Sequence, residues 1–347
     1  AFTAVLIIAC PCALALSSPF TLSAALSIFD KNKLYIKNTA AIEQMAAIDT
    51  VVFDKTGTIS SPTASSMYFE GKLNSIERNL LASLCRNSNH PLSREILKYL
   101  GNVDMLNINH YQEVVGRGQS GVYQDYRIKV GSASYVNTDK VDLEGSVVYV
   151  KINDTLKGYF TLEQSWRSGL NDVINELKAE KYDLHLISGD NERRAEALRM
   201  IFPSKAFLLF NQTPSEKLNR ISDWQNHGKK VCMLGDGLND AGALRKADLG
   251  IAVSDDINNF SPGCDAILDG EAFHKLPKFF EFSKDAVKVI KMSFVISLLY
   301  NVVGLSFAVQ GTMSPLFAAI LMPISTVTII SFTSLMTRGY AKRRKLI

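Results

Sequence analysis

The sequence has no marked excess of charge of either sign. Its 38 lysine and arginine residues are nearly balanced by 34 aspartate and glutamate residues, and the formal net charge is +4 at pH 7. A protein that binds nucleic acid through the phosphate backbone usually carries clustered basic charge. The balance therefore gives no indication of a nucleic-acid partner, and we expect none.

Cysteine is also scarce. The five cysteines are an odd number, and only Cys10 and Cys12 lie close together in the sequence. A Cys-x-Cys spacing is too tight for a zinc ribbon, and five cysteines in 347 residues do not make the dense pattern of a disulfide-stapled secreted domain. We therefore expect the bulk of the chain to lie in a reducing compartment.

Long stretches of the chain lack charge altogether. Residues 1–29, 292–309 and 316–336 contain no Asp, Glu, Lys or Arg, and about 20 apolar residues suffice to cross a bilayer. Basic residues follow the first stretch, precede the second and follow the third, so the positive-inside rule places the middle of the chain in the cytoplasm. We predict transmembrane helices at 1–30, 285–310 and 314–337. A basic cytoplasmic tail should follow at 338–347.

A secretory signal peptide is the alternative for the first apolar stretch. That stretch has neither a basic start nor a cleavage pattern of small residues, so we favour a membrane span. The chain begins at Ala1, already inside the stretch, and we therefore expect it to be a piece of a longer polypeptide.

The middle of the chain has no internal repeat and no low-complexity linker. Residues 50–53 predict a buried strand, and after Trp166 predicted helices alternate with predicted strands that end at polar loops. This pattern predicts an α/β fold with a parallel sheet and with sites at the strand ends, built from residues 31–61 and 158–284. Residues 62–157 show helical patches followed by hairpin-like runs, which predicts an inserted α+β domain.

Four polar clusters stand near predicted strand ends, Asp-Lys-Thr-Gly-Thr at 54–58, Ser-Gly-Asp at 188–190, Pro-Ser-Glu-Lys at 214–217 and Gly-Asp-Gly-Leu-Asn-Asp at 235–240. Each of them alone would be an ordinary turn. Together they suit phosphoryl transfer, which needs mainly positioning and charge neutralisation. Asp54 offers a carboxylate nucleophile. Ser188 and the backbone near Gly189 offer hydrogen-bond donors, and Lys217 offers an ammonium. Asp236 and Asp240 offer carboxylate ligands for Mg²⁺.

In this order, the four motifs resemble the phosphorylation domain of P-type ATPases, within the haloacid dehalogenase superfamily. The resemblance implies that ATP phosphorylates Asp54. Hydrolytic members of the superfamily usually carry a general acid–base Asp two residues after the nucleophile, and here that position is Thr56. The aspartyl phosphate should therefore persist, as an energy-coupling intermediate must. The resemblance also implies the catalytic residues Asp54, Lys55, Thr56, Ser188, Gly189, Asp190 and Lys217. It implies the Mg²⁺ ligands Asp54, Thr56, Asp236 and Asp240.

The insert at 62–157 resembles the nucleotide-binding domain of the same family. Ser-Asn-His-Pro-Leu-Ser at 88–93 is similar to the His-Pro signature of the heavy-metal-transporting class, in which the histidine would lie against the adenine or the phosphates of ATP. The Gly-x-Gly turn within residues 114–121 would let backbone approach the nucleotide closely. The resemblance implies four nucleotide contacts, His90, Gly116, Gly118 and Gly131.

The insert also departs from the family's pattern. Cys85 and Asn89 stand where acidic residues are common, and Ser132 stands where Asn usually follows the glycine. Gln164 replaces a frequent Asp. His90 and the glycines are therefore the nucleotide contacts that the resemblance supports best.

The Cys10-Pro11-Cys12 sequence resembles the membrane metal site of the heavy-metal class. Proline removes a backbone hydrogen bond and opens a helix locally, and irregular backbone at membrane depth is tolerated where it lines a cavity. Two thiolates there would select soft ions such as Cu(I), Ag(I), Zn(II) or Cd(II). The alternative is a pair of small buried thiols beside a kink.

The other two predicted spans favour Cu(I). Zinc-class relatives usually carry a Lys and an Asp there, whereas both spans in this sequence lack charge. Tyr300-Asn301 and the Met322-x-x-Ser-Thr sequence resemble the copper class, and a thioether suits a soft monovalent ion. Pro323 and Thr326 depart from the class pattern, and a lipid-facing role for Met322 is the alternative. The resemblance implies six ion-binding residues, Cys10, Cys12, Tyr300, Asn301, Met322 and Thr326.

The motifs together predict an enzyme of the bacterial inner or plasma membrane that uses ATP and Mg²⁺ to export a soft metal ion. We favour Cu(I) as this ion, and Zn(II) or Cd(II) is the alternative. A copper chaperone would deliver the ion. This sequence contains no Thr-Gly-Glu actuator segment and no Cys-x-x-Cys metal-binding domain, and we expect the missing N-terminal part of the same polypeptide to carry them with the other spans. Two other classes stay open, a haloacid-dehalogenase-type phosphatase and a non-catalytic metal sensor. Thr56 argues against the first, and the intact Asp54 and Lys217 argue against the second.

Overall fold

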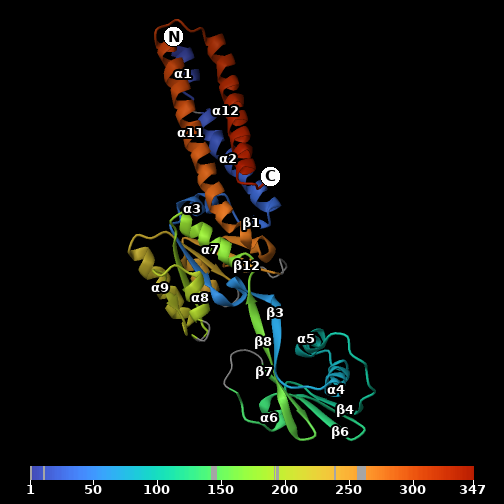
Figure 1. Cartoon of the computed structure of the whole chain (residues 1–347). Helices are drawn as coiled ribbons and strands as arrows, with labels where there is room; N and C mark the ends of the chain where they lie inside the picture. Colours follow the sequence, from blue (N-terminus) through green and yellow to red (C-terminus); the bar gives the residue numbers. More distant parts are fainter. Residues whose placement is uncertain are drawn as a thin grey trace. The chain divides into compact units, whose positions relative to one another are not determined.

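A computed structural model of the chain describes residues 2–10, 12–141, 147–190, 192, 195–237, 240–255 and 263–347, without the side chains of 12, 61–66 and 162–164 (Figure 1). The chain divides into two compact units: unit 1 comprises residues 1–61 and 166–347, and unit 2 comprises residues 62–165. The predicted end of the insert at residue 157 lies inside strand β8, Thr155–Trp166, so unit 2 continues to residue 165.

Unit 1 contains the predicted parallel sheet. Over the described residues its strands lie in the order β1-β13-β12-β11-β2-β9-β10, and every neighbouring pair is parallel except β1 with β13. The strands are β1 Leu34–Ile36, β2 Thr50–Asp54, β9 Asp183–Ile187, β10 Leu208–Leu209, β11 Val231–Gly235, β12 Leu249–Ser254 and β13 Ala266–Asp269. The α/β prediction is confirmed, and the short antiparallel edge strand β1 adds to it.

Strand β2 shows why the sheet needs cover on both faces. All five of its residues are buried. Val51 and Phe53 belong to one hydrophobic cluster, whereas Val52, pointing to the other face, belongs to another. A strand buried on both faces is a continuous apolar run, which is the pattern of residues 50–53.

Helices provide that cover. Helix α7 buries Leu170, Val173, Ile174 and Leu177, which recur at the spacing of one helical face. The flanking helices are α3 Ala40–Ala47, α7 Leu170–Ala179, α8 Ala195–Ile201, α9 Pro214–Asn226 and α10 Ala241–Lys246, with the 3₁₀ segment η3 Gly270–Lys275.

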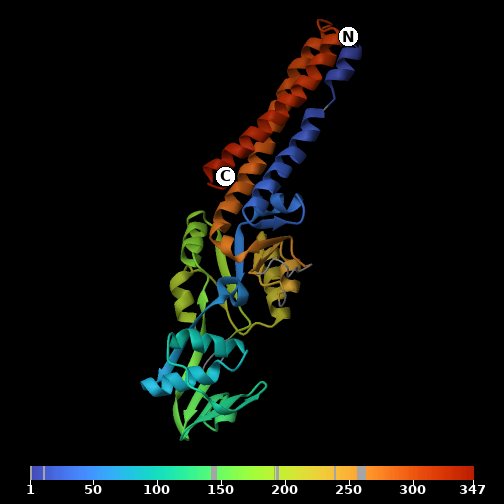
Figure 2. The ribbon, with the colours of Figure 1, turned by 90° about the vertical axis from the view of Figure 1, so that its right-hand side faces the viewer.

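The apolar ends of the chain form a bundle within unit 1. Helices α1 Phe2–Ile8 and α2 Cys12–Lys31 lie beside α11 Leu276–Val309 and α12 Pro315–Arg343 (Figures 1 and 2). Over the described residues three segments are long and apolar enough to cross a membrane, Phe2–Lys31, Gly270–Val309 and Pro315–Arg343. They correspond to the three predicted spans, and α11 and α12 extend beyond them at the end near the sheet.

Polar and aromatic contacts close that end of the bundle. Arg344 Nε lies 2.7 Å from Asp285 Oδ2, across α12 and α11. Phe29 of α2 packs edge-on against Phe279 and Phe282 of α11, with ring centroids 5.8 and 5.3 Å apart. These contacts join α2, α11 and the end of α12 to one another.

Unit 2 is an α+β domain built on an antiparallel sheet. The strand order is β3-β8-β7-β6-β5-β4, and helix α4 begins at a capping box formed by Asn74 and Glu77. The elements are β3 Ser60–Gly71, α4 Ser75–Cys85, α5 Pro91–Leu100, β4 Asn109–Val114, β5 Gly118–Tyr123, β6 Tyr126–Gly131, α6 Ala133–Val136, β7 Val147–Ile152 and β8. The predicted insert of mixed helices and hairpins is confirmed.

Acid should destabilise unit 1 through His185 of β9. This imidazole is stacked on Trp224 with 4.6 Å between ring centroids and accepts the Phe207 N–H at 3.1 Å. Burial lowers the pKa of His185 from 6.5 to about 4. Between these values the unfolded chain binds a proton that the folded chain does not, so stability should fall as pH drops from about 6.5 to 4.

His185→Gln keeps an acceptor for the Phe207 amide but does not titrate. We expect its thermal midpoint, followed by tryptophan fluorescence, to fall less steeply over this pH range than that of the unsubstituted protein. His227→Gln, at an exposed histidine, is the control and should not change the slope. An unchanged slope for His185→Gln would contradict the assignment.

Candidate active site

The carboxyl edge of the parallel sheet brings three predicted residues into direct contact. Lys217 Nζ lies 2.6 Å from Asp54 Oδ1 and 2.6 Å from Asp240 Oδ1. Asp54 is the last residue of β2, Lys217 lies in the first turn of α9, and Asp240 immediately precedes α10. The three residues are only 4%, 6% and 2% exposed, so their charges interact in a poorly hydrated site.

Burial changes the proton affinities in this cluster. Burial and, after it, the neighbouring charge of Asp240 raise the pKa of Asp54 to about 7, against the opposing effect of Lys217. Burial also raises the pKa of Asp240. For Lys217, burial lowers the pKa, but the two carboxylates outweigh that effect and bring it above its usual value. The lysine is therefore charged, and the two carboxyl groups compete for the same cation.

The Mg²⁺ ligands predicted from the sequence lie around this cluster. Asp240 Oδ2 is buried and has no hydrogen-bond partner among the residues that the structure describes, and Asp236 raises the pKa of Asp54 through its charge. A side-chain carbon at Gly57 would lie 3.1 Å from Asp236 Cβ, so Asp236 lies over the loop that follows Asp54. Hard carboxylate oxygens, one of them without a partner, fit Mg²⁺.

In the described part of the chain, no three His, Cys, Asp or Glu side chains are gathered as a ready-made metal site. Lys217 lies between Asp54 and Asp240, where its ammonium neutralises the carboxylates. The residues fit the metal in chemistry, and their assignment as its ligands stays a prediction.

The remaining predicted catalytic residues meet at Asp190. Lys55 Nζ lies 3.0 Å from Asp190 Oδ2, and the Thr56 hydroxyl donates to the same oxygen at 2.8 Å. Burial alone would raise the pKa of Asp190, but the hydrogen bonds from Lys55 and Thr56 outweigh it and lower the pKa. The Asp190 N–H donates to Ser188 Oγ at 3.0 Å, beside Gly189. The acceptor role of Ser188 leaves its hydroxyl hydrogen available for a phosphoryl oxygen.

With this geometry in view, comparison with known proteins identifies the family. Residues 48–248 match the haloacid dehalogenase-like hydrolases. The chain belongs to this family. It is 28% identical over 342 residues to a copper-exporting P-type ATPase of Staphylococcus haemolyticus and 30% identical over 343 residues to one of Staphylococcus saprophyticus. Each match covers 94% of this chain and 43% of the relative, so the chain spans less than half of these relatives.

Solved structures confirm the fold. A phosphorylated-state structure of a zinc-transporting PIB-type ATPase superposes with a TM-score of 0.79 at 24% identity, over 95% of this chain and 56% of that one. The catalytic domain of a CPx-ATPase, CopB-B, matches at 29% identity with a TM-score of 0.50, over 73% of this chain and 95% of that one. The fold of this chain, a haloacid dehalogenase-like domain with an inserted domain and three long apolar helices, is therefore similar to that of the zinc-transporting ATPase over 95% of this chain.

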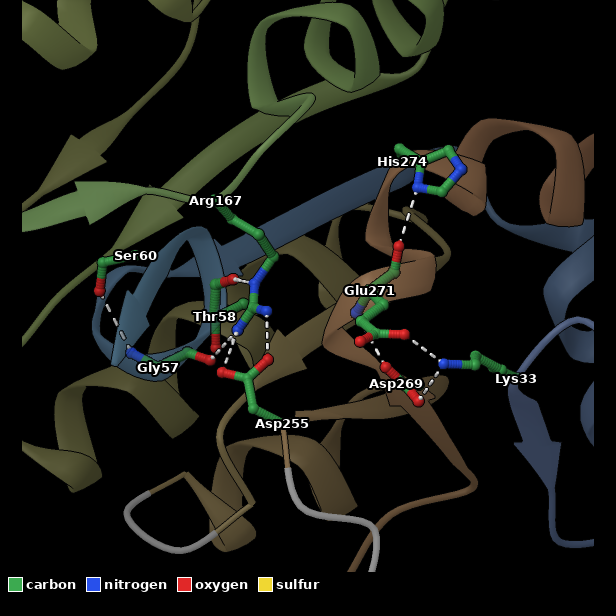
Figure 3. A network of polar contacts seen from close by, with 9 residues as sticks. All are labelled: Lys33, Gly57, Thr58, Ser60, Arg167, Asp255, Asp269, Glu271 and His274. Carbon is green, nitrogen blue, oxygen red and sulfur yellow. Dashed lines mark hydrogen bonds and ion pairs between the residues drawn. The ribbon is translucent and has the colours of Figure 1, made fainter. Parts of the chain in front are cut away.

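The loop that follows Asp54, residues 55–59, is held by Asp190 and also by Arg167, whose role was not predicted from the sequence. The Arg167 guanidinium donates to the carbonyl oxygens of Thr58, at 2.9 Å, and Gly57, at 3.0 Å, and pairs with Asp255 at 2.5 Å (Figure 3). A side-chain carbon at Gly270 would lie 1.9 Å from Asp255 Oδ1 and 2.0 Å from Arg167 Nη1. A side chain at position 270 would therefore have to displace the Arg167–Asp255 pair.

A pocket in unit 2 brings together the four residues predicted to contact nucleotide. His90, Gly116, Gly118 and Gly131 all line a cavity of about 310 Å³. His90 begins α5, and its Nδ1 accepts the Leu92 N–H at 3.2 Å. Side-chain carbons at Gly118 and Gly131 would lie 2.4 and 2.3 Å from backbone oxygens of the neighbouring strand or turn. These two glycines are thus also required by close backbone packing.

The residues predicted to bind the transported ion lie on three elements of the bundle. Cys10 lies between α1 and α2. The structure does not describe Pro11 or the side chain of Cys12. Tyr300 and Ser325 line one small cavity together with Ala13, the neighbour of Cys12.

Two of these residues hydrogen-bond to backbone within the bundle. The Tyr300 hydroxyl donates to the Leu321 carbonyl at 2.9 Å, which joins α11 to α12, and the Thr326 hydroxyl donates to the Met322 carbonyl at 3.2 Å. Asn301 follows Tyr300 on α11. Binding of the ion by this set stays a prediction.

Arg167→Lys should slow phosphorylation of Asp54. Lysine keeps the charge but cannot reach two carbonyls and a carboxylate with one planar fork, and a small displacement of a reaction loop lowers rates by about 10- to 100-fold. The measurement is the rate of phosphorylation by ATP in the whole polypeptide. Arg220→Lys, at an exposed arginine of α9, should have no effect, and a wild-type rate for Arg167→Lys would contradict this role of Arg167.

Proposed function

We propose that the chain is the catalytic and ion-binding portion of a P-type ATPase that exports a soft metal ion, Cu(I), through an aspartyl phosphate at Asp54. The contact of Lys217 with both Asp54 and Asp240 carries the proposal. A buried carboxylate at a strand end, neutralised by an ammonium and flanked by further carboxylates, suits transfer of a phosphoryl group.

Asp54 is the proposed nucleophile. One of its carboxylate oxygens attacks the γ-phosphorus of ATP, a P–O bond to Asp54 forms, and the bond to the leaving ADP breaks. Lys217 lies within 2.6 Å of the attacking carboxylate, so its ammonium can neutralise charge on the transferring group. The Ser188 hydroxyl and the backbone at Gly189 donate to its oxygens. Asp54, Thr56, Asp236 and Asp240 would hold Mg²⁺, which would supply charge neutralisation when bound.

Thr56 supports a pump over a phosphatase. It occupies the position of the hydrolases' acid–base Asp, and its hydroxyl is engaged by Asp190 at 2.8 Å. No carboxylate at this position can activate water against the phosphoaspartate. The intermediate therefore lasts long enough to be coupled to ion movement.

Two observations support Cu(I) as the ion. The apolar stretches 1–29, 292–309 and 316–336 contain no charge that would balance a divalent ion, and the curated relatives cited above are named as copper exporters. A solved structure of similar fold is of a zinc transporter, so Zn(II) and Cd(II) are the competing ions. Cys10 and Cys12 would supply thiolates, with Tyr300, Asn301, Met322 and Thr326 from α11 and α12.

The proposal also assigns a setting. The three apolar segments, long enough to cross a bilayer, support a membrane location, and the Staphylococcus relatives favour the bacterial plasma membrane. The rest of the same polypeptide would supply the actuator and the other spans, and a copper chaperone would deliver the ion. The catalytic units would face the cytoplasm.

The ion specificity of ATP hydrolysis tests this proposal. In the whole polypeptide under reducing conditions, we expect Cu(I) and Ag(I) to stimulate hydrolysis and Zn(II) and Cd(II) to have little effect. Cys10→Ser and Cys12→Ser should each abolish the stimulation, because oxygen is a poor ligand for soft ions. Met322→Leu should weaken it less, because it removes one neutral ligand and leaves both thiolates.

Cys264→Ser, at a buried cysteine of unit 1 outside the bundle, is the matched control and should keep the stimulation. Stimulation by Zn(II) and Cd(II) alone would overturn the choice of copper. Hydrolysis of small phosphoesters without any metal-ion stimulation would favour a phosphatase, and the absence of hydrolysis with retained metal binding would favour a sensor.

A further inference from the structure

The lining of the pocket in unit 2 includes two buried polar side chains, Ser93 of α5 and Gln119 of β5. They are 5% and 4% exposed. Much of the remaining lining is apolar, from Leu92, Ile96, Val130, Val147 and Val148. Aliphatic walls suit a flat ring, and a few polar groups in such a pocket select what the ring carries at its edge.

The Gln119 amide fixes the direction of the Ser93 hydroxyl. Gln119 Nε2 donates to Ser93 Oγ at 3.0 Å and to Cys85 Sγ at 3.5 Å, so both of its hydrogens are used. Burial raises the pKa of the Cys85 thiol to about 12, which keeps this sulfur neutral. Because Ser93 Oγ accepts from the amide, its own hydrogen points elsewhere, and among the described side chains and backbone no acceptor for it is found.

The Gln119 carbonyl keeps accepting capacity. The Tyr111 hydroxyl lies 3.0 Å from Glu113 Oε2 and 3.3 Å from Gln119 Oε1 and has one hydrogen for these two acceptors, whereas the carbonyl oxygen of Gln119 has two lone pairs. Glu113 also accepts the Ser88 hydroxyl, at 2.6 Å. The lining of the pocket therefore presents one donor, from Ser93, and one acceptor, from Gln119.

We propose that Ser93 and Gln119 select adenine in this pocket: the Ser93 hydroxyl donates to N1, and Gln119 Oε1 accepts from the 6-amino group. The inference rests on the proposed use of ATP and identifies the specificity residues of that site. Adenine offers an acceptor at N1 and a donor at position 6, whereas hypoxanthine and guanine offer a donor at N1 and an acceptor at O6. In a 6-oxopurine the N1–H would therefore face the Ser93 donor, and O6 would face the Gln119 acceptor. Two donors or two acceptors that face each other in a buried site cannot hydrogen-bond, so such a base is strongly rejected.

Gln119→Glu nearly keeps the shape of the pocket and changes the polarity of one of the two groups. A carboxylate accepts the Ser93 hydroxyl hydrogen, so Ser93 then presents an acceptor, which suits the N1–H of hypoxanthine and not N1 of adenine, while the group opposite position 6 remains an acceptor. The test uses the whole polypeptide and measures how unlabelled ATP and ITP compete with labelled ATP in the phosphorylation of Asp54. We expect the ratio of ITP affinity to ATP affinity to rise by about tenfold or more, which corresponds to one hydrogen-bond mismatch.

Two further variants keep the result interpretable. Ser93→Ala removes the donor and should weaken ATP by about tenfold while changing ITP little. Gln112→Glu adds the same charge on the neighbouring strand β4, at an exposed residue that does not line the pocket, and should leave the ratio unchanged. If Gln119→Glu fails to fold, Ser93→Ala alone decides the question.

Phosphorylation of Asp54 by inorganic phosphate separates the two proposals, because it requires unit 1 and no nucleotide. Equal competition by ATP and ITP in the unsubstituted protein, or an unchanged ratio in both pocket variants, would overturn the assignment of Ser93 and Gln119 and leave the pump proposal standing. If inorganic phosphate labels Asp54 but no nucleoside triphosphate labels it or competes, both proposals fail.

Discussion

The contact of one buried ammonium with two buried carboxylates is the interaction on which the structure of unit 1 depends. Lys217 lies 2.6 Å from Asp54 and from Asp240, far from bulk water. Removing one partner from such a cluster leaves an uncompensated charge, at a cost of about 3 to 5 kcal/mol. The elements that carry the three residues must therefore hold them rigidly, and the parallel sheet with helices on both faces does this.

The same cluster supports the chemistry proposed for the site. Burial that raises the pKa of Asp54 to about 7 also strips its carboxylate of water, and positioned charge in a dry site stabilises a transferring phosphoryl group more strongly than it would in solvent. The loop after Asp54 is held on one side by Asp190 and on the other by Arg167. Its geometry is therefore fixed before any substrate arrives.

Short segments of the chain join this sheet to the apolar helices α2 and α11. Helix α2 ends at Lys31, and strand β1 follows at Leu34 and pairs with β13. Lys33, between them, lies 3.2 Å from Asp269 and also contacts Glu271 at the start of η3 (Figure 3). Helix α11 begins directly after η3. The span that carries Cys10 and Cys12 and the span that carries Tyr300 are thus both joined to the sheet that carries Asp54.

The sequence was sufficient to predict the parallel sheet, the insert, the three apolar helices and the meeting of Asp54, Lys217 and Asp240. These follow from local signals: buried runs, alternating periodicity and motifs at strand ends that a parallel sheet must bring to one edge. The clamp of Arg167 on Gly57 and Thr58 was not predicted, because its contacts join residues more than a hundred positions apart.

The short edge strand β1 also escaped prediction. Three residues carry too little periodicity to show, and the strand depends on its pairing with β13. In the pocket, His90 and the glycines were predicted from motifs. The roles of Ser93 and Gln119 became visible only from the direction of their hydrogen bonds, which sequence spacing does not encode.

Locating the phosphoryl group after reaction with ATP tests the central claim most directly. The whole polypeptide should take label from γ-³²P-ATP only with Mg²⁺, in a form that is stable in acid, cleaved by hydroxylamine and found on the peptide containing Asp54. Asp54→Asn, which nearly preserves shape and removes the nucleophile, should take none. An acid-stable, hydroxylamine-sensitive label that persists in Asp54→Asn would contradict the account.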